Sequence, residues 1–158
     1  MFVYGADFFL YRPGLLLLFA GLLLTLPLSR GPLRIGPITF SLHWMLLGLT
    51  LCVLGLHGFY VGALARVFFD YSGDIKHKWL AAFSYTRSVV LSALAVTAGA
   101  GLAAPLVIRY IRSGFLLTDD VFPTTHLAVT GLLLVIGGFM NFTFTLALHA
   151  AAANVRRK

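Results

Sequence analysis

Residues 121–155 read VFPTTHLAVTGLLLVIGGFMNFTFTLALHAAAANV, a run of 35 residues without Asp, Glu, Lys or Arg. A helix needs about 20 predominantly apolar residues to cross the hydrocarbon core of a bilayer. Runs such as Leu15–Leu18 lack the alternation of a barrel strand, so the apolar segments predict helices. Three more charge-free segments precede this one, at 13–29, 35–65 and 88–108. The sequence therefore predicts an all-α integral membrane bundle of four transmembrane helices, over about 8–28, 41–69, 86–111 and 124–154.

The composition excludes most other classes of protein. Of the 158 residues, 59% are hydrophobic and 11% are charged, whereas a soluble domain has about 25% charged residues. A mean hydropathy of +0.93 is the opposite of the signature of disorder. The net charge of +7 comes from basic residues at the ends of apolar runs, which indicates lipid headgroups rather than nucleic acid as the partner. We expect a single transmembrane domain over residues 1–158 with no internal repeat.

The distribution of basic residues predicts the topology. Four spans put both ends of the chain on one side of the membrane. With that side in the cytoplasm, 8 basic residues lie inside and 4 outside, namely Arg30, Arg34, Arg109 and Arg112. Cytoplasmic loops carry the excess of Lys and Arg. We therefore expect a multi-pass protein with both termini in the cytoplasm.

The connections between spans differ in character. Residues 30–40 form a short outer loop that turns at Gly36-Pro37. Between the second and third spans, one helical face carries Ile75, Trp79, Leu80 and Phe83, while Lys76, His77 and Lys78 fall away from it. This pattern predicts a short amphipathic helix in the headgroup layer. The outer loop at 113–123 carries Asp119-Asp120, which we expect to be solvated rather than to bind a metal.

Small residues within the spans predict close helix packing. The second span contains Gly58-x-x-x-Gly62 with Gly55 nearby, and the fourth contains Gly137-Gly138. Such residues let two helix backbones approach closely in a membrane. The motif does not say whether the partner helix belongs to the same chain, so a homo-oligomer is one possibility.

Polar residues in or beside the spans are the candidates for function. His57 and His149 are expected to face the bundle and to form hydrogen bonds there. Arg66 closes the second span and Arg87 opens the third, on the same predicted inner side. Either arginine can extend along the apolar surface to reach water. Two guanidiniums at one membrane surface can also bind a lipid phosphate, with Lys76 and Lys78 adding weaker attraction.

No catalytic constellation stands out in the sequence. The chain has no nucleotide-binding glycine loop after a strand and no nucleophile elbow. Its single Cys52 leaves no Cys-based metal site and no intrachain disulfide. Asp70 and Asp74, at a helix end and a Gly turn, are expected to be solvated.

Five stretches follow one another along the chain: Tyr11-Arg12-Pro13-Gly14, Ile35–His43, Leu64–Phe68, Phe83–Ser88 and Gly137–Phe144. In this order, they resemble the membrane region of bacterial family 2 glycosyltransferases, the enzymes similar to dolichol-phosphate mannose and glucose synthases.

The resemblance implies transfer of a sugar from a nucleotide donor to a polyprenyl phosphate in the bacterial inner membrane. In the family, a cytosolic catalytic domain of the GT-A type precedes the membrane region. That domain carries the nucleotide-sugar pocket and an Asp-x-Asp motif for a divalent metal, Mg²⁺ or Mn²⁺. This chain would then be a membrane-anchoring and lipid-phosphate-positioning module, without cofactor of its own, and the chemistry would belong to a separate catalytic chain.

Two other functions fit a four-span protein. One is a small transporter or a flippase for lipid-linked sugars, although proton-coupled transporters usually need an intramembrane carboxylate, and the spans contain none. The other is a purely structural subunit of a membrane assembly.

Overall fold

The computed structural model describes residues 7–69, 74–114 and 122–154. Its elements are η1 (Asp7–Tyr11), α2 (Arg12–Leu28), β1 (Leu33–Ile35), β2 (Ile38–Phe40), α3 (Leu42–Phe68), α4 (Asp74–Ala82), α5 (Tyr85–Arg112) and α6 (Phe122–Asn154). Four helical segments are long and apolar enough to span a membrane: Phe8–Leu28, Leu42–Phe68, Tyr85–Arg112 and Thr124–Ala153. These segments begin and end within one residue of the predicted spans, and the all-α membrane bundle is confirmed.

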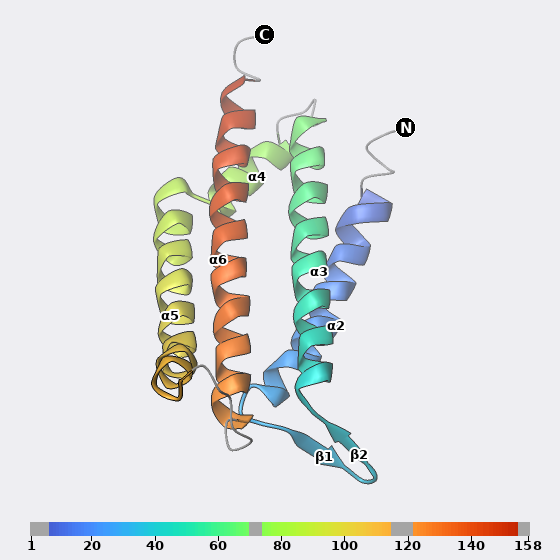
Figure 1. Ribbon diagram of the computed structural model, residues 1–158. Helices are drawn as coiled ribbons and strands as arrows, with labels where there is room; N and C mark the ends of the chain where they lie inside the picture. Colours follow the sequence, from blue (N-terminus) through green and yellow to red (C-terminus); the bar gives the residue numbers. More distant parts are fainter. Residues whose placement is uncertain (1–6, 70–73, 115–121, 155–158) are drawn as a thin grey trace.

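The long helices lie side by side in the order α5, α6, α3, α2, as Figure 1 shows. The central pair, α3 and α6, run in the same direction. One end of the bundle holds α4, together with the start of η1 and the end of α6, and we call it the α4 end. The two strands lie at the opposite end, which we call the hairpin end. The two ends of the described chain are therefore on one side of the bundle.

The connection between α2 and α3 is a β-hairpin, where the sequence predicted only a loop. Leu33 pairs with Phe40 and Ile35 with Ile38 in antiparallel register. Gly36 and Pro37 form the predicted turn, and Gly36 has a φ of 60°. A positive φ costs a glycine nothing, and two-residue hairpin turns need it. The strands were missed because each has only three residues.

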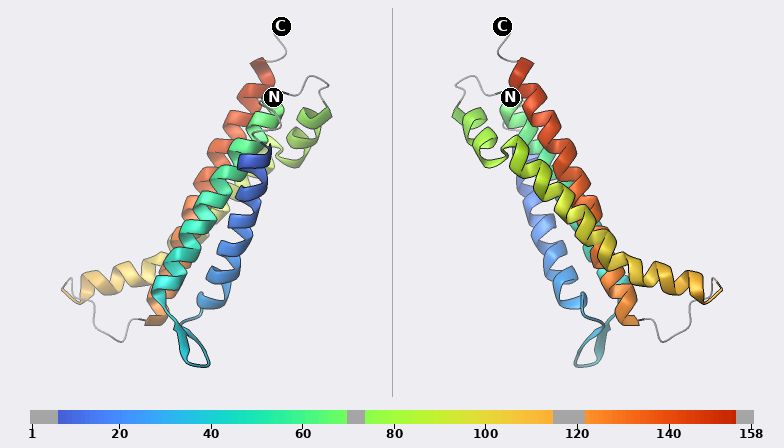
Figure 2. Two further views of the ribbon diagram at one scale, coloured as in Figure 1. Left: turned by 90° about the vertical axis from the view of Figure 1, so that its right-hand side faces the viewer. Right: turned by 90° about the vertical axis from the view of Figure 1, so that its left-hand side faces the viewer.

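The third span is not straight. Figure 2 shows that the part of α5 at the hairpin end bends sharply away from the bundle. Pro105 lies inside this helix, where it removes one backbone hydrogen bond and kinks the helix. Arg109 and Arg112 belong to the part beyond Pro105, whose apolar residues Val107 and Ile111 are also exposed.

The predicted amphipathic helix is present as α4, although two of its residues differ from the expected faces. Trp79 and Leu80 pack against the core of the bundle as predicted. Ile75, placed on the same face by the sequence pattern, is 39% exposed. Lys76, expected to point away, donates a hydrogen bond from Nζ to the carbonyl oxygen of Ala152 at 2.7 Å. The last turn of α6 has carbonyls without intrahelical partners, and this one attracts the ammonium group.

The chain contains an internal repeat that the sequence analysis did not find. Shifting α3 by 83 residues places it on α6 with these identical pairs: His43/His126, Gly48/Gly131, Leu49/Leu132, Leu51/Leu134, Gly55/Gly138 and Phe59/Phe142. Shifting α2 by 78 residues places it on α5 with these identical pairs: Leu16/Leu94, Ala20/Ala98, Gly21/Gly99, Leu24/Leu102, Pro27/Pro105 and Leu28/Leu106. The α2–α3 and α5–α6 hairpins thus repeat a pattern of identical residues at fixed offsets.

Equivalent residues make equivalent contacts in the two hairpins. A Cβ on Gly21 would meet the carbonyl oxygen of Gly48 at 2.7 Å, and a Cβ on Gly99 would meet that of Gly131. Gly55 lies against the backbone of Leu18 in the first hairpin. The glycines Gly48, Gly55 and Gly62 recur every seven residues, so they form one seam along α3. These contacts hold each hairpin together by backbone approach rather than by large side chains.

Candidate functional site

One amide joins three helices near the α4 end. The side chain of Asn141 on α6 donates from Nδ2 to Ser92 Oγ at 2.9 Å and to the Ser88 carbonyl oxygen at 3.3 Å, both on α5. Its Oδ1 accepts a hydrogen bond from the hydroxyl of Tyr60 on α3 at 3.0 Å. A polar side chain inside a membrane bundle is stabilised by such interhelical bonds. Asn141 therefore connects the two hairpins through their polar groups.

Aromatic rings fix α4 to the bundle. Trp79 contacts Tyr11 of η1 at a ring-centroid distance of 6.4 Å, Phe59 of α3 at 5.8 Å and Phe144 of α6 at 6.3 Å. It also stacks on Phe83 at 5.7 Å. α4 is thus held by both hairpins, rather than lying free on the membrane surface.

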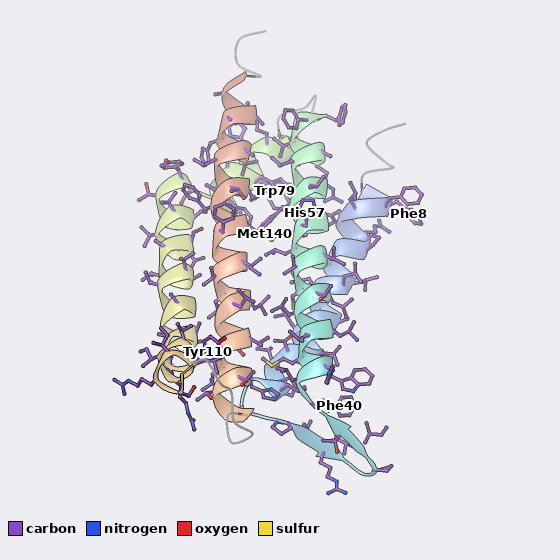
Figure 3. All side chains as sticks on the ribbon, viewed as in Figure 1. Phe8, Phe40, His57, Trp79, Tyr110 and Met140 are labelled. Carbon is purple, nitrogen blue, oxygen red and sulfur yellow. The ribbon has the colours of Figure 1, made fainter. Side chains whose placement is uncertain are left out.

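A groove with a volume of about 250 Å³ lies between α3 and α6. Figure 3 shows the labelled side chains of His57 and Met140 between these two helices. The groove is lined from α3 by His57, Tyr60, Val61 and Leu64, and from α6 by Met140, Thr143, Phe144 and Ala147. Its walls are largely apolar, with the imidazole of His57 and the hydroxyls of Tyr60 and Thr143 as their polar side-chain groups.

The histidines differ in their surroundings. His149 forms the expected bond within the bundle, with Nε2 donating to the Phe83 carbonyl oxygen at 3.1 Å. His57 also lies on the α6 side of α3, in the groove, but it is exposed there and the expected hydrogen bond is absent among residues 7–69, 74–114 and 122–154. His126 is 1% exposed, and neither of its ring nitrogens has a partner within those ranges.

The basic candidates gather at the α4 end but differ in what they contact. The guanidinium of Arg66 lies over the ring of Tyr11 at 4.0 Å from its centroid. Lys76 binds the end of α6, whereas Lys78 and Arg87 are exposed. Arg66 belongs to α3 and Arg87 to α5, and α6 lies between these helices. The structure therefore puts both arginines at one end of the bundle without bringing them into contact.

The packing glycines fall into two groups. Gly55 and Gly62 are buried against η1 and α2, and a Cβ on Gly62 would meet the Tyr11 backbone at 2.8 Å. Gly138 packs against Ser92, whose carbonyl oxygen would lie 2.9 Å from a Cβ there. Gly58 and Gly137 are looser, with nearest contacts at 3.2 and 3.8 Å. The close contacts described are within the chain.

Comparison with known proteins identifies one family, described as the glycosyltransferase family 2 C-terminal transmembrane region, which matches residues 63–152. The match spans more than half of the 158 residues. The chain belongs to this family. No curated protein and no solved structure matches it. The matched part of the glycosyltransferase transmembrane region contains α4, the α5–α6 hairpin, Asn141 and all four basic candidates.

Sequence reasoning missed the groove and the Asn141 network. The asparagine was visible as a polar residue in a charge-free segment, which is a signal of interhelical hydrogen bonding. Its partners Tyr60 and Ser92 could not be chosen without the arrangement of the helices. The groove carries no sequence signal of its own, because its walls are made of ordinary apolar residues.

Proposed function

We propose that the chain is the membrane module of a polyprenyl-phosphate glycosyltransferase in the bacterial inner membrane. Its family membership over residues 63–152 is the observation that carries this proposal. The module anchors a GT-A-type catalytic domain or chain, and holds the lipid phosphate where a nucleotide sugar reaches it. Any Mg²⁺ or Mn²⁺ would bind the nucleotide sugar in that catalytic partner.

The α4 end is the proposed place for the phosphate. Arg66, Lys78 and Arg87 lie at this end, and positive charge accumulates on the cytoplasmic side of membrane proteins. The Arg66 guanidinium lies over the ring of Tyr11, and a guanidinium is the group that binds phosphate by two-point contact. Charge-assisted hydrogen bonds to phosphate are among the stronger ones in proteins. The proposal places this end in the cytoplasm, where nucleotide sugars occur.

Binding of polyprenyl phosphate to the purified protein in nanodiscs tests the proposal. We expect polyprenyl phosphate to bind at least tenfold more tightly than phosphatidylglycerol, which also carries a phosphate. Equal binding of the two lipids would overturn the proposed function.

A flippase for lipid-linked sugars is the second candidate, and the internal repeat favours it. Parallel repeats related by an axis along the membrane normal occur in transporters, with the substrate site at the repeat interface. Reconstituted protein that moves a fluorescent polyprenyl-phosphate sugar between leaflets would support this candidate. A module that binds the lipid without moving it supports the first.

A further inference from the structure

The part of α5 beyond Pro105 leaves the bundle. In Figure 1, α5 is upright as far as the bend and its last part is seen nearly end-on. Every residue from 107 to 114 is exposed. The buried residues of α5 all precede the proline and are Ser88, Ser92 and Gly99. We call residues 106–112 the distal segment of α5, and the packing that holds α5 on α6 stops before it.

The membrane crossing of α5 is complete before the distal segment begins. Residues Tyr85 to Ala104 cover about 30 Å at 1.5 Å per residue, which is the thickness of the hydrocarbon core of a bilayer. The repeat indicates the same end point, because Pro105 pairs with Pro27 at the offset of 78 and α2 ends one residue after Pro27. The whole of α5 is apolar enough to span a membrane, but a crossing that ends near Pro105 leaves the distal segment at the bilayer surface.

The bend is also better placed at the surface than in the hydrocarbon. Pro105 has no N–H group, so the carbonyl oxygen of Gly101, four residues earlier, lacks its usual donor within the helix. An unpaired carbonyl is costly in the bilayer core, where no water reaches it. A bend at the membrane surface lets water donate to this carbonyl.

The distal segment has an apolar face and a basic face. Val107 and Ile111 are four residues apart, and Tyr110 follows Val107 by three, so these side chains share one side of the helix. Arg109 and Arg112 are three residues apart and lie on the opposite side. A helix with this division lies in the plane of the interface, with its apolar face toward the acyl chains. Its arginines reach the headgroups, whose phosphates accept charge-assisted hydrogen bonds.

We propose that the distal segment of α5 is a surface helix that binds the phospholipid headgroup layer at the hairpin end. Arg109 and Arg112 contact lipid phosphates, and Val107, Tyr110 and Ile111 face the acyl chains. A phospholipid surface is the partner because it alone offers an anionic layer directly above an apolar one. The inference is independent of the proposed function, which concerns the opposite end of the bundle.

The depth of spin labels in the bilayer tests the proposal. In a Cys52→Ser background, labels at Val107→Cys and Ile111→Cys are measured by power saturation with oxygen and nickel-EDDA, in vesicles of phosphatidylcholine and phosphatidylglycerol. The matched control pair is Val90→Cys and Leu94→Cys, which are exposed and equally spaced in the upright part of α5. We expect the control pair to differ in depth by about 6 Å, and the distal pair by less than half of that.

Three outcomes would overturn the proposal. A depth difference in the distal pair as large as in the control pair would show that α5 continues across the membrane as a span. Labels that nickel-EDDA reaches more readily than oxygen would place the distal segment in water. Labels shielded from both reagents would show that protein, such as a second copy of the chain, covers this face.

A second measurement tests the arginines. Reversing their charge in Arg109→Glu/Arg112→Glu should repel the segment from anionic headgroups, so the label at Ile111→Cys should become at least about twofold more accessible to nickel-EDDA in phosphatidylglycerol vesicles. Arg34→Glu is the matched control, because Arg34 is exposed in the β-hairpin at the same end of the bundle. It should leave the label at Ile111→Cys unchanged. Equal accessibility in all three proteins would show that Arg109 and Arg112 do not bind the headgroups.

Discussion

Lys76 Nζ donates a 2.7 Å hydrogen bond to the carbonyl oxygen of Ala152, which joins α4 to the end of α6. A cation at a helix C-terminus is worth about 0.3–1 kcal/mol. We expect Lys76→Met to raise amide hydrogen exchange in α4 by about two- to fivefold, since 1.4 kcal/mol corresponds to a factor of ten. Lys78→Met is the control, because Lys78 is exposed on the same helix. Equal exchange in both variants would show that the bond to Ala152 does not hold α4.

Asn141 should couple the stability of the two hairpins. Asn141→Leu removes its hydrogen bonds to Tyr60, Ser88 and Ser92, and interhelical bonds in membranes average about 0.6 kcal/mol each. We expect a loss of about 2 kcal/mol in the free energy of unfolding, measured in mixed micelles. Tyr60→Phe removes only one of these bonds and should cost about 0.6 kcal/mol. A loss in Tyr60→Phe as large as in Asn141→Leu would contradict this role for the amide.

Two glycine substitutions should have opposite outcomes. A Cβ on Gly55 would overlap the backbone of Leu18, which cannot move without separating α2 from α3. Overpacking of this kind costs about 1–3 kcal/mol, so Gly55→Ala should lower the unfolding free energy by that amount. Gly101 on α5 has open space around it, and Gly101→Ala should be neutral or stabilising, because alanine favours the helix. Equal losses in both variants would argue against the α2–α3 seam.

Arg87 should contribute to lipid-phosphate binding. Arg87→Ala is expected to weaken polyprenyl-phosphate binding by about tenfold or more, since hydrogen bonds to charged groups contribute about 1.5–3 kcal/mol. Arg66→Ala should have a similar effect. Arg87→Lys should recover only part of the affinity, because lysine cannot make the planar two-point contact. Arg34→Ala, in the hairpin at the other end, should bind like the parent. If all the alanine variants bind polyprenyl phosphate like the parent, Arg66 and Arg87 do not bind the phosphate and only extend to the headgroup layer.

Labelling of single cysteines checks the orientation. In a Cys52→Ser background, Thr39→Cys lies in the β-hairpin and Lys78→Cys in α4, at opposite ends of the bundle. A membrane-impermeant maleimide should label Thr39→Cys in intact cells and Lys78→Cys only after permeabilisation. The reverse pattern would place the α4 end outside and would contradict the proposed cytoplasmic position of the phosphate.

The spans were predictable because length and lack of charge determine which segments a bilayer accepts. The end of α3 and the start of α5 lie within two residues of Arg66 and Arg87, whose charge limits the apolar segments. The turn at Gly36-Pro37 was equally visible. The strands beside it were not, since three residues a side give no detectable alternation.

The site was less predictable, because its contacts depend on which helices are neighbours. Sequence alone suggested that Arg66 and Arg87 share one phosphate, since α4 connects their helices. The structure places α6 between those helices. Lys76 belongs to a helix cap rather than to the open surface, a distinction that depends on where α6 ends. The repeat was detectable in principle, but its identities are mainly glycines and leucines, which are common in all membrane helices.

The repeat also bears on how the protein is made. The close backbone contacts of the first hairpin, such as that between Gly14 and Gly55, involve only residues before the α4 region. That hairpin can therefore close without any contribution from α5 or α6. Between the long helices, the described contacts of the second hairpin with the first are mainly those of α6 with α3. The contacts are thus compatible with assembly in the membrane two helices at a time, in the order of translation.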